Sequence, residues 1–164
     1  MTQIGLISDT HSFLDDAVFT HFKDCDEIWH AGDFGNPDLL AQLQAFKPVR
    51  GVYGNIDGPE VRWQMPLTLS FNCEQVPVFI THIGGYPGRY APNIKKQIQQ
   101  AGAKLFISGH SHILKIMFDE GLQCLHINPG AAGKSGWHKV RTLVRFTIDG
   151  NIIANCQVIE LGLR

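Results

Sequence analysis

Residues 4–11 of the chain read IGLISDTH, a short apolar run that passes directly into side chains able to bind metal ions. The apolar part, Ile4–Ser8, has the length of a buried strand. Segments of helical length then alternate with further apolar runs, in the order Ser12–Lys23, Glu27–Ala31, Asn36–Phe46 and Val49–Tyr53. This β-α-β-α-β pattern predicts a parallel sheet with right-handed crossovers, covered by helices, with functional loops at the carboxyl ends of the strands.

Beyond residue 60 the pattern changes to short strands. The expected strands are Leu67–Phe71, Val76–Thr81, Leu105–Ser108, Ile113–Phe118, Leu122–Ile127, Val140–Ile148 and Ile152–Val158. One helix, opened by proline, is expected at Pro92–Ala101. The turn sequences Asp119-Glu120-Gly121 and Asp149-Gly150 suit tight hairpins. We therefore predict a mixed α/β domain whose second half adds antiparallel strands, as two stacked sheets with helices outside.

Composition sets the class of protein. Hydrophobic residues make up 44% and charged residues 18% of 164 residues, a balance typical of one globular domain over residues 1–164. The formal net charge of −1 encodes no general attraction to nucleic acid or to an anionic membrane, so any phosphate recognition must be local. The N-terminus lacks a leader pattern, no apolar stretch reaches membrane-spanning length, and the cysteines are scattered. These features predict a soluble, cytoplasmic protein with reduced thiols.

Polar side chains follow the ends of five expected strands. They are Asp9, His11, Asp33, Asn55, His82, His110 and His112. In an open α/β sheet these ends lie along one edge, so the residues should converge there. Any one of them alone reads more simply as a helix cap, a turn former or a structural histidine. Their occurrence at successive strand ends favours a shared metal site.

The ligand types suit two divalent ions. Carboxylates, imidazoles and one amide together fit manganese, with iron, zinc or nickel as alternatives, better than calcium. The pairs Asp9-x-His11 and His110-x-His112 would point to one side if their backbone is extended. Glycine precedes Asp33, Asn55 and His110, which predicts close backbone approach at crowded strand ends.

In order and spacing these motifs resemble the calcineurin-like metallophosphoesterase superfamily, whose pattern is DxH, GD, GNH[DE], H and GHxH. The match spans residues 9 to 112, and the short chain is similar to the compact YfcE-type phosphodiesterases. The resemblance implies a four-layer α/β/β/α sandwich of two mixed β-sheets flanked by helices. It also implies assembly as a homo-oligomer, for which the sequence identifies no interface.

The same resemblance implies how the ligands divide. The first ion would be held by Asp9, His11 and His112, and the second by Asn55, His82 and His110, with Asp33 bridging them. Asp33, Asn55 and His82 would also act in catalysis. Two ions so placed activate a bridging water as hydroxide and withdraw charge from the phosphate during in-line displacement.

The sequence departs from the family pattern at two places. Ile56 stands where many relatives carry a general-acid histidine, and His82-Ile83-Gly84 replaces the HGH of compact relatives. Arg89 could contact phosphate, and Tyr86 or Tyr90 could stack on an aromatic group, although a plain surface loop is the simpler reading.

His138 is a further candidate proton donor. We assign His21, His30 and His126 to structure, and read Asn128-Pro129-Gly130 as a structural turn.

Without an obvious acid, a leaving group of low pKa would be favoured, so a small phosphodiester such as a cyclic nucleotide or an aryl diester is the preferred substrate, with a monoester left open. A protein-binding scaffold similar to the retromer subunit of this fold is the alternative. The seven competent ligand positions weigh against it. A nuclease has less support, because the chain has no dense basic stripe beyond Lys95-Lys96.

Overall fold

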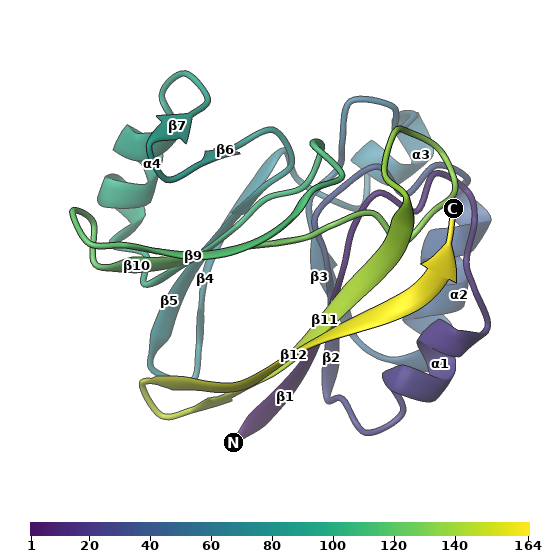
Figure 1. The fold of residues 1–164 in the computed structure, drawn as a ribbon, viewed down its shortest axis with the longest axis horizontal. Coiled ribbons are helices and arrows are strands. Elements are labelled where there is room, and N and C mark those ends of the chain that lie inside the picture. Colours follow the sequence, from purple (N-terminus) through teal and green to yellow (C-terminus); the bar gives the residue numbers. More distant parts are fainter.

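The computed structural model describes all residues, Met1–Arg164, as two five-stranded sheets stacked face to face (Figure 1). The first sheet has the strand order β12-β11-β1-β2-β3. Its strands are β1 (Thr2–Ile7), β2 (Glu27–His30), β3 (Val49–Gly51), β11 (Val140–Asp149) and β12 (Ile152–Leu163). The β1, β2 and β3 strands are parallel, as the alternating sequence predicts, and β11 and β12 extend the sheet in antiparallel register.

The second sheet has the order β4-β5-β8-β10-β9 and is also mixed. Its strands are β4 (Thr68–Cys73), β5 (Val76–Thr81), β8 (Leu105–Ile107), β9 (Leu114–Asp119) and β10 (Cys124–Pro129). The β5, β8 and β10 strands are parallel, whereas β4 and β9 pair in antiparallel register at the two edges. A small hairpin, β6 (Gly85–Tyr86) with β7 (Arg89–Tyr90), stands apart from both sheets.

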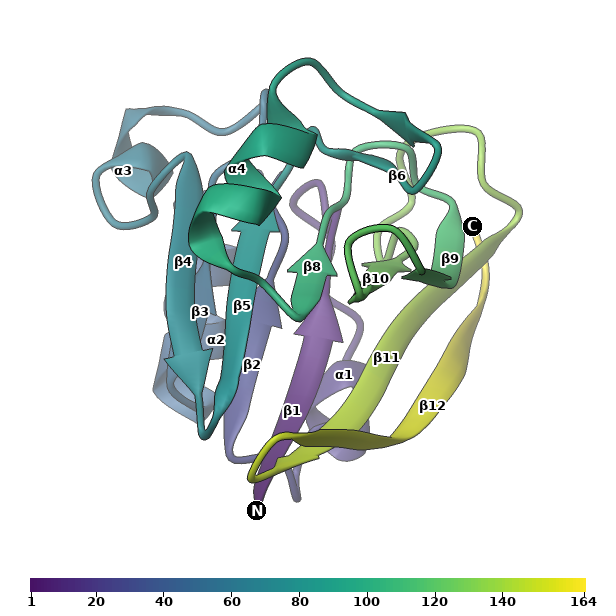
Figure 2. The same cartoon turned by 90° about the vertical axis from the view of Figure 1, so that its left-hand side faces the viewer.

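Helices cover the outer faces and complete the predicted four-layer sandwich. The first sheet carries α1 (Ala17–His21), α2 (Pro37–Phe46) and the short α3 (Pro59–Arg62), and α4 (Ile94–Ala101) lies on the second sheet (Figures 1 and 2). The start of α2 is fixed locally, because the Asn36 side chain accepts a hydrogen bond from the Asp38 N–H at 2.9 Å and Pro37 occupies the first turn. None of these helices is long and apolar enough to cross a membrane.

Three buried clusters hold the layers together. The largest lies between the sheets and includes Trp29 from the first sheet and Ile80 from the second. A second joins α1 and α2 to the outer face of the first sheet, and a third joins Ile94 and Ile98 of α4 to Phe106 of β8. Burial of this apolar surface is the main stabilising term of the sandwich.

The main local difference from the sequence prediction is at Ser12–Lys23, where only the five residues of α1 are helical. The start of this segment is tied to the loop after β2 instead: the Ser12 N–H donates to the Phe34 carbonyl at 2.9 Å, and Ser12 has a φ of 67°. A left-handed residue with its N–H engaged elsewhere does not enter a helix. The short α3 helix and the β6–β7 hairpin were not predicted, because neither contains an apolar run of strand or helix length.

Candidate metal centre

The seven predicted side chains converge at the carboxyl ends of five strands. Three of these strands, β1, β2 and β3, belong to the first sheet, and β5 and β8 belong to the second. Figure 2 shows the arrowheads of β1, β2, β5 and β8 pointing to the same end of the sandwich. The site therefore lies across both sheets, rather than along the edge of one sheet as the sequence predicts.

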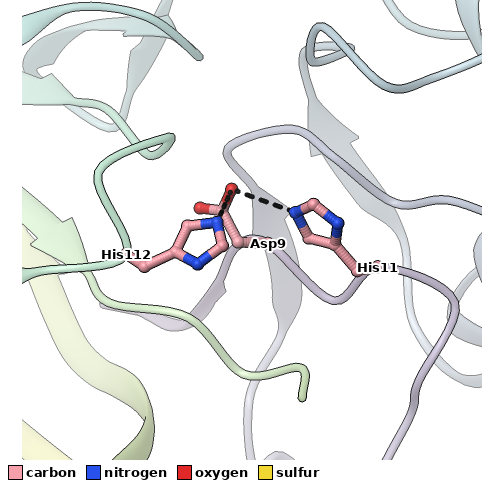
Figure 3. A group of neighbouring side chains, drawn as sticks. All are labelled: Asp9, His11 and His112. Carbon is pink, nitrogen blue, oxygen red and sulfur yellow. Dashed lines mark ion pairs between the residues drawn. The ribbon is translucent and has the colours of Figure 1, made fainter. Parts of the chain in front are cut away.

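The first group of side chains is Asp9, His11 and His112. One potential ligand atom from each residue lies within 4.8 Å of the others. The Asp9 Oδ1 atom is 3.2 Å from His112 Nε2 and 3.8 Å from His11 Nε2, and Figure 3 shows both imidazole rings directed at this carboxylate. Residues that are about 100 positions apart in the chain thus bring three potential ligand atoms together.

The second group is Asp33, His82 and His110, whose potential ligand atoms likewise lie within 4.8 Å of one another. Asn55 belongs with this group, because its Oδ1 is 3.0 Å from His82 Nε2 and 3.0 Å from His110 Nδ1. The His82 Nδ1 donates to the Ala31 carbonyl at 2.7 Å, which leaves Nε2 as the lone-pair nitrogen facing the group.

Asp33 lies between the two groups. Its Oδ2 atom is 3.3 Å from His11 Nε2 in the first group and 3.2 Å from His82 Nε2 in the second. The other carboxylate oxygen accepts the backbone N–H of Ile56 at 3.0 Å, which fixes the orientation of the side chain. One carboxylate oxygen is therefore presented to both groups at once.

The backbone of the Asp9-x-His11 and His110-x-His112 pairs is not extended. The sequence predicts that the two side chains of each pair point to one side only if the backbone is extended, so this condition is not met. Asp9, His11, Asp33, His110 and His112 all have left-handed φ values, between 44° and 69°. Non-glycine residues adopt this region rarely, at a cost of about 1–3 kcal/mol each, and are found in turns and clustered at active sites. The loops are held by contacts with each other: the Asp9 N–H donates to Gly32 and the His11 N–H to Asp33.

Two glycines allow the close approach that the sequence predicts. A Cβ atom at Gly54 would lie 2.0 Å from Asp33 Oδ1, and a Cβ atom at Gly32 would lie 2.6 Å from His82 Nδ1. Both distances are far below van der Waals contact. No other residue type fits at these positions without displacing Asp33 or His82.

The electrostatics of the site favour a bound cation. Burial opposes ionisation of Asp9 and Asp33, but the adjacent imidazoles outweigh it and hold the pKa of both carboxyls well below the usual range. In return, the two carboxylates raise the pKa of His11 to about 9. Asp9 Oδ1 and His11 Nε2 are buried and have no hydrogen-bond partner. Buried oxygen and nitrogen atoms that face each other without a hydrogen-bond partner are well suited to act as ligands of a divalent ion.

Asp57, to which the sequence analysis gave no role, supports the site from behind. Its buried carboxylate accepts three backbone N–H groups, from Asp33 at 3.0 Å, Gly54 at 2.8 Å and Gly35 at 2.8 Å. These bonds link the loops after β2 and β3, which carry Asp33 and Asn55. Asp57 occupies the acidic position at the end of the GNH[DE] motif, and this match was the signal available in the sequence.

His30 is structural, as predicted, and is built into the same support. Its Nδ1 accepts the Gly32 N–H at 3.0 Å, which makes Nε2 the donor to Thr10 Oγ1 at 3.1 Å. Complete burial lowers the pKa of His30 to about 3, so the ring is neutral.

The candidate substrate contacts have mixed outcomes. Ile56 is 46% exposed beside Asp33, and Arg89 is exposed. The tyrosines are engaged elsewhere: Tyr90 donates to Asp119 at 2.5 Å, and the Lys115 ammonium lies 3.7 Å from the centre of the Tyr86 ring. The simpler reading of this loop therefore holds for both tyrosines.

His138 lies next to the first group, with its ring centre 5.2 Å from that of His112. Its Nε2 donates to the Gly133 carbonyl at 2.7 Å, and its Nδ1 is buried without a partner. The structure thus brings His138 to the site, where it packs against a candidate ligand.

The comparisons with known proteins agree with the geometry of a metal site. Residues 2–151 match the family model of the calcineurin-like phosphoesterase superfamily domain. A probable metallophosphoesterase of Methanothermobacter thermautotrophicus is 36% identical over 133 residues, which cover 78% of this chain and 76% of the relative.

Two solved structures share the fold. An archaeal phosphodiesterase superposes with a TM-score of 0.78 at 22% identity, over 97% of this chain and 99% of that one. Vps29 of Chaetomium thermophilum superposes with a TM-score of 0.77 at 12% identity, over 100% of both chains.

Proposed function

The chain belongs to the calcineurin-like phosphoesterase superfamily, and on that basis we propose that it is a phosphodiesterase that hydrolyses a small phosphodiester with the help of two divalent metal ions. The observation that carries this proposal is the position of Asp33, whose Oδ2 lies 3.3 Å and 3.2 Å from an imidazole of each group. A carboxylate shared in this way is suited to bridging two ions.

The proposed ligands follow the two groups. Asp9, His11 and His112 hold one ion, Asn55, His82 and His110 hold the other, and Asp33 touches both. The mixture of oxygen and imidazole ligands fits manganese best, with iron, zinc or nickel as alternatives. When bound, the ions supply a water nucleophile at neutral pH and neutralise the developing charge on the phosphate.

The protein supplies orientation and little acid catalysis. The Ala31 carbonyl and the Ile56 N–H fix the faces that His82 and Asp33 present to the reaction. Ile56 has no proton to donate, and the Nε2–H of His138 is committed to a backbone carbonyl. Substrates with a leaving group of low pKa are therefore favoured, because they leave without protonation.

A scaffold function is the second candidate, supported by two exposed tryptophans near the centre. Trp63, which follows Arg62 at the end of α3, is 81% exposed, and Trp137, next to His138, is 97% exposed. Tryptophan is enriched among the residues that contribute most binding energy at protein interfaces. In that case the metal centre would be part of a docking face, without turnover.

The test is hydrolysis of bis-p-nitrophenyl phosphate by chelator-stripped protein, with manganese added back, beside an Asp33→Asn variant prepared in the same way. We expect turnover that requires metal and is lost in the variant. The monoester p-nitrophenyl phosphate, assayed in parallel, measures the preference for diesters. Metal binding without turnover on either ester would replace the enzyme proposal with the scaffold.

A further inference from the structure

A cavity of about 400 Å³ opens beside the second ligand group. Asn55 and His82 form part of its wall, so a molecule bound there also touches the proposed metal ligands. The rest of the wall comes from five parts of the chain: the loop after β3, α3, the start of β4, the end of β5, and α4. This volume lies in the range of small-molecule sites.

The wall is mainly apolar and has a single charged residue. Leu67, Ile83 and Ile94 contribute aliphatic surface, and Arg62 is the one charged side chain among the lining residues. The Arg62 guanidinium lies 4.5 Å from the centre of the Tyr53 ring and donates to the Asp57 carbonyl at 2.6 Å. Its charge is therefore fixed between the aromatic wall and the loop that carries Asn55.

Two of the apolar residues are unusually accessible for their type. Leu67 is 58% exposed and Ile83 is 47% exposed at the cavity. In the HGH of compact relatives, Ile83 takes the place of the glycine and Gly84 takes the place of the second histidine. A departure that removes a polar group from the family pattern thus adds apolar surface next to the metal centre, where an apolar part of a ligand would cover it.

We propose that this cavity binds a ring-bearing ester group of the substrate, an aryl or nucleoside arm, while its phosphate contacts the metal ligands. This inference rests on the phosphodiesterase function proposed above. The aliphatic walls cover the faces of an uncharged ring, Gln97 offers an amide to polar ring edges, and Arg62 adds positive charge near the phosphate. A basic arm would meet the like charge of Arg62 and no acidic partner there.

The first measurement is the calorimetric affinity of manganese-loaded protein for four compounds: inorganic phosphate, methyl phosphate, phenyl phosphate and thymidine 5′-monophosphate. Burial of a ring should make phenyl phosphate or the nucleotide bind about tenfold more tightly than methyl phosphate. A further gain for the nucleotide over phenyl phosphate identifies a nucleoside arm, and equal affinities identify an aryl arm.

A variant then locates the ring. Leu67→Asn changes an exposed side chain without adding charge, and should cut the ring-dependent advantage to about threefold or less. Ile152→Asn is the matched control, because Ile152 is 61% exposed but lies at the start of β12, outside the cavity lining. It should leave the advantage unchanged.

The outcomes separate this inference from the one on which it rests. If phosphate and methyl phosphate bind but rings bring no gain, the cavity proposal is wrong and the phosphodiesterase remains. If the gain survives in a Leu67→Asn, Ile83→Asn double variant, the ring binds elsewhere and the proposal is also wrong. If no phosphate compound binds the metal-loaded protein, the proposed function fails, and the cavity proposal with it.

Discussion

The two ligand groups of the metal centre have similar side chains in different surroundings. In the first group Asp9 is completely buried, and His11 and His112 are partly covered. In the second group His82 is buried, but His110 and Asn55 are exposed, and Asn55 lines the cavity. Enclosed ligands have few contacts with water to give up when an ion binds, whereas exposed ligands leave room for a substrate. We therefore expect tighter metal retention at the first group and substrate contact at the second.

The largest effect should come from removing one imidazole from each group. We expect His112→Ala and His110→Ala each to lower turnover by more than the roughly 10–100-fold that is typical of residues that only orient a ligand. The two should differ in metal titrations: His112→Ala should lose the tighter of two binding events, and His110→Ala the weaker. The reverse order would contradict the assignment of retention to the enclosed group.

The convergence of these side chains could be predicted because each follows an apolar run directly. Buried strands are visible in the sequence, and parallel strands bring their carboxyl ends to the same end of the fold. The expected strand Val76–Thr81 agrees with β5, and Asn36–Phe46 agrees with α2 to within one residue. Local composition was sufficient for these elements because their own apolar side chains decide their burial.

The geometry of the ligands could not be predicted, because it depends on contacts between loops. The left-handed backbone at Asp9 and His11 is maintained by hydrogen bonds to the loop after β2, more than 20 residues away. The role of Asp57 has the same origin, since its partners lie in two different loops. The cavity forms where segments from both sheets meet. The hydrophobic periodicity of the sequence does not predict contacts between such distant segments.

A second, smaller effect should follow from crowding Asp33, the residue shared by the two groups. In Gly54→Ala the added methyl group would meet Asp33 Oδ1 at 2.0 Å. Overpacking of this kind costs about 1–3 kcal/mol of stability, and displacement of Asp33 should lower turnover about 10–100-fold.

Gly58→Ala is the matched control for that variant, because nothing lies within 4 Å of a Cβ atom there and its φ of −85° suits any residue. Thermal unfolding and assays of the two variants, made in parallel, test the prediction. Equal activities would show that Asp33 tolerates displacement and is not a shared ligand.

The smallest effect concerns His126, a histidine of the interior. Unlike the histidines of the metal centre, it belongs to neither ligand group. Burial lowers the pKa of His126 to about 4, and its Nε2 is buried without a partner. Between pH 6.5 and about 4 the unfolded chain therefore binds a proton that the folded chain excludes. The stability that this neutral ring contributes is complete above pH 6.5 and is lost as the pH falls through that window.

His126→Leu should remove this titration, so that the slope of unfolding free energy against pH below 6.5 falls by up to about 1.4 kcal/mol per pH unit. Urea unfolding of chelator-treated protein at several pH values measures the slope, and the range above pH 7 is the internal control, where the slopes of the two proteins should coincide. Activity at neutral pH should change little, because the ring packs against Phe106 and belongs to neither ligand group. An unchanged slope below pH 6.5 would mean that the buried ring takes up its proton in the folded state, and that this interior is more polar than its apolar neighbours indicate.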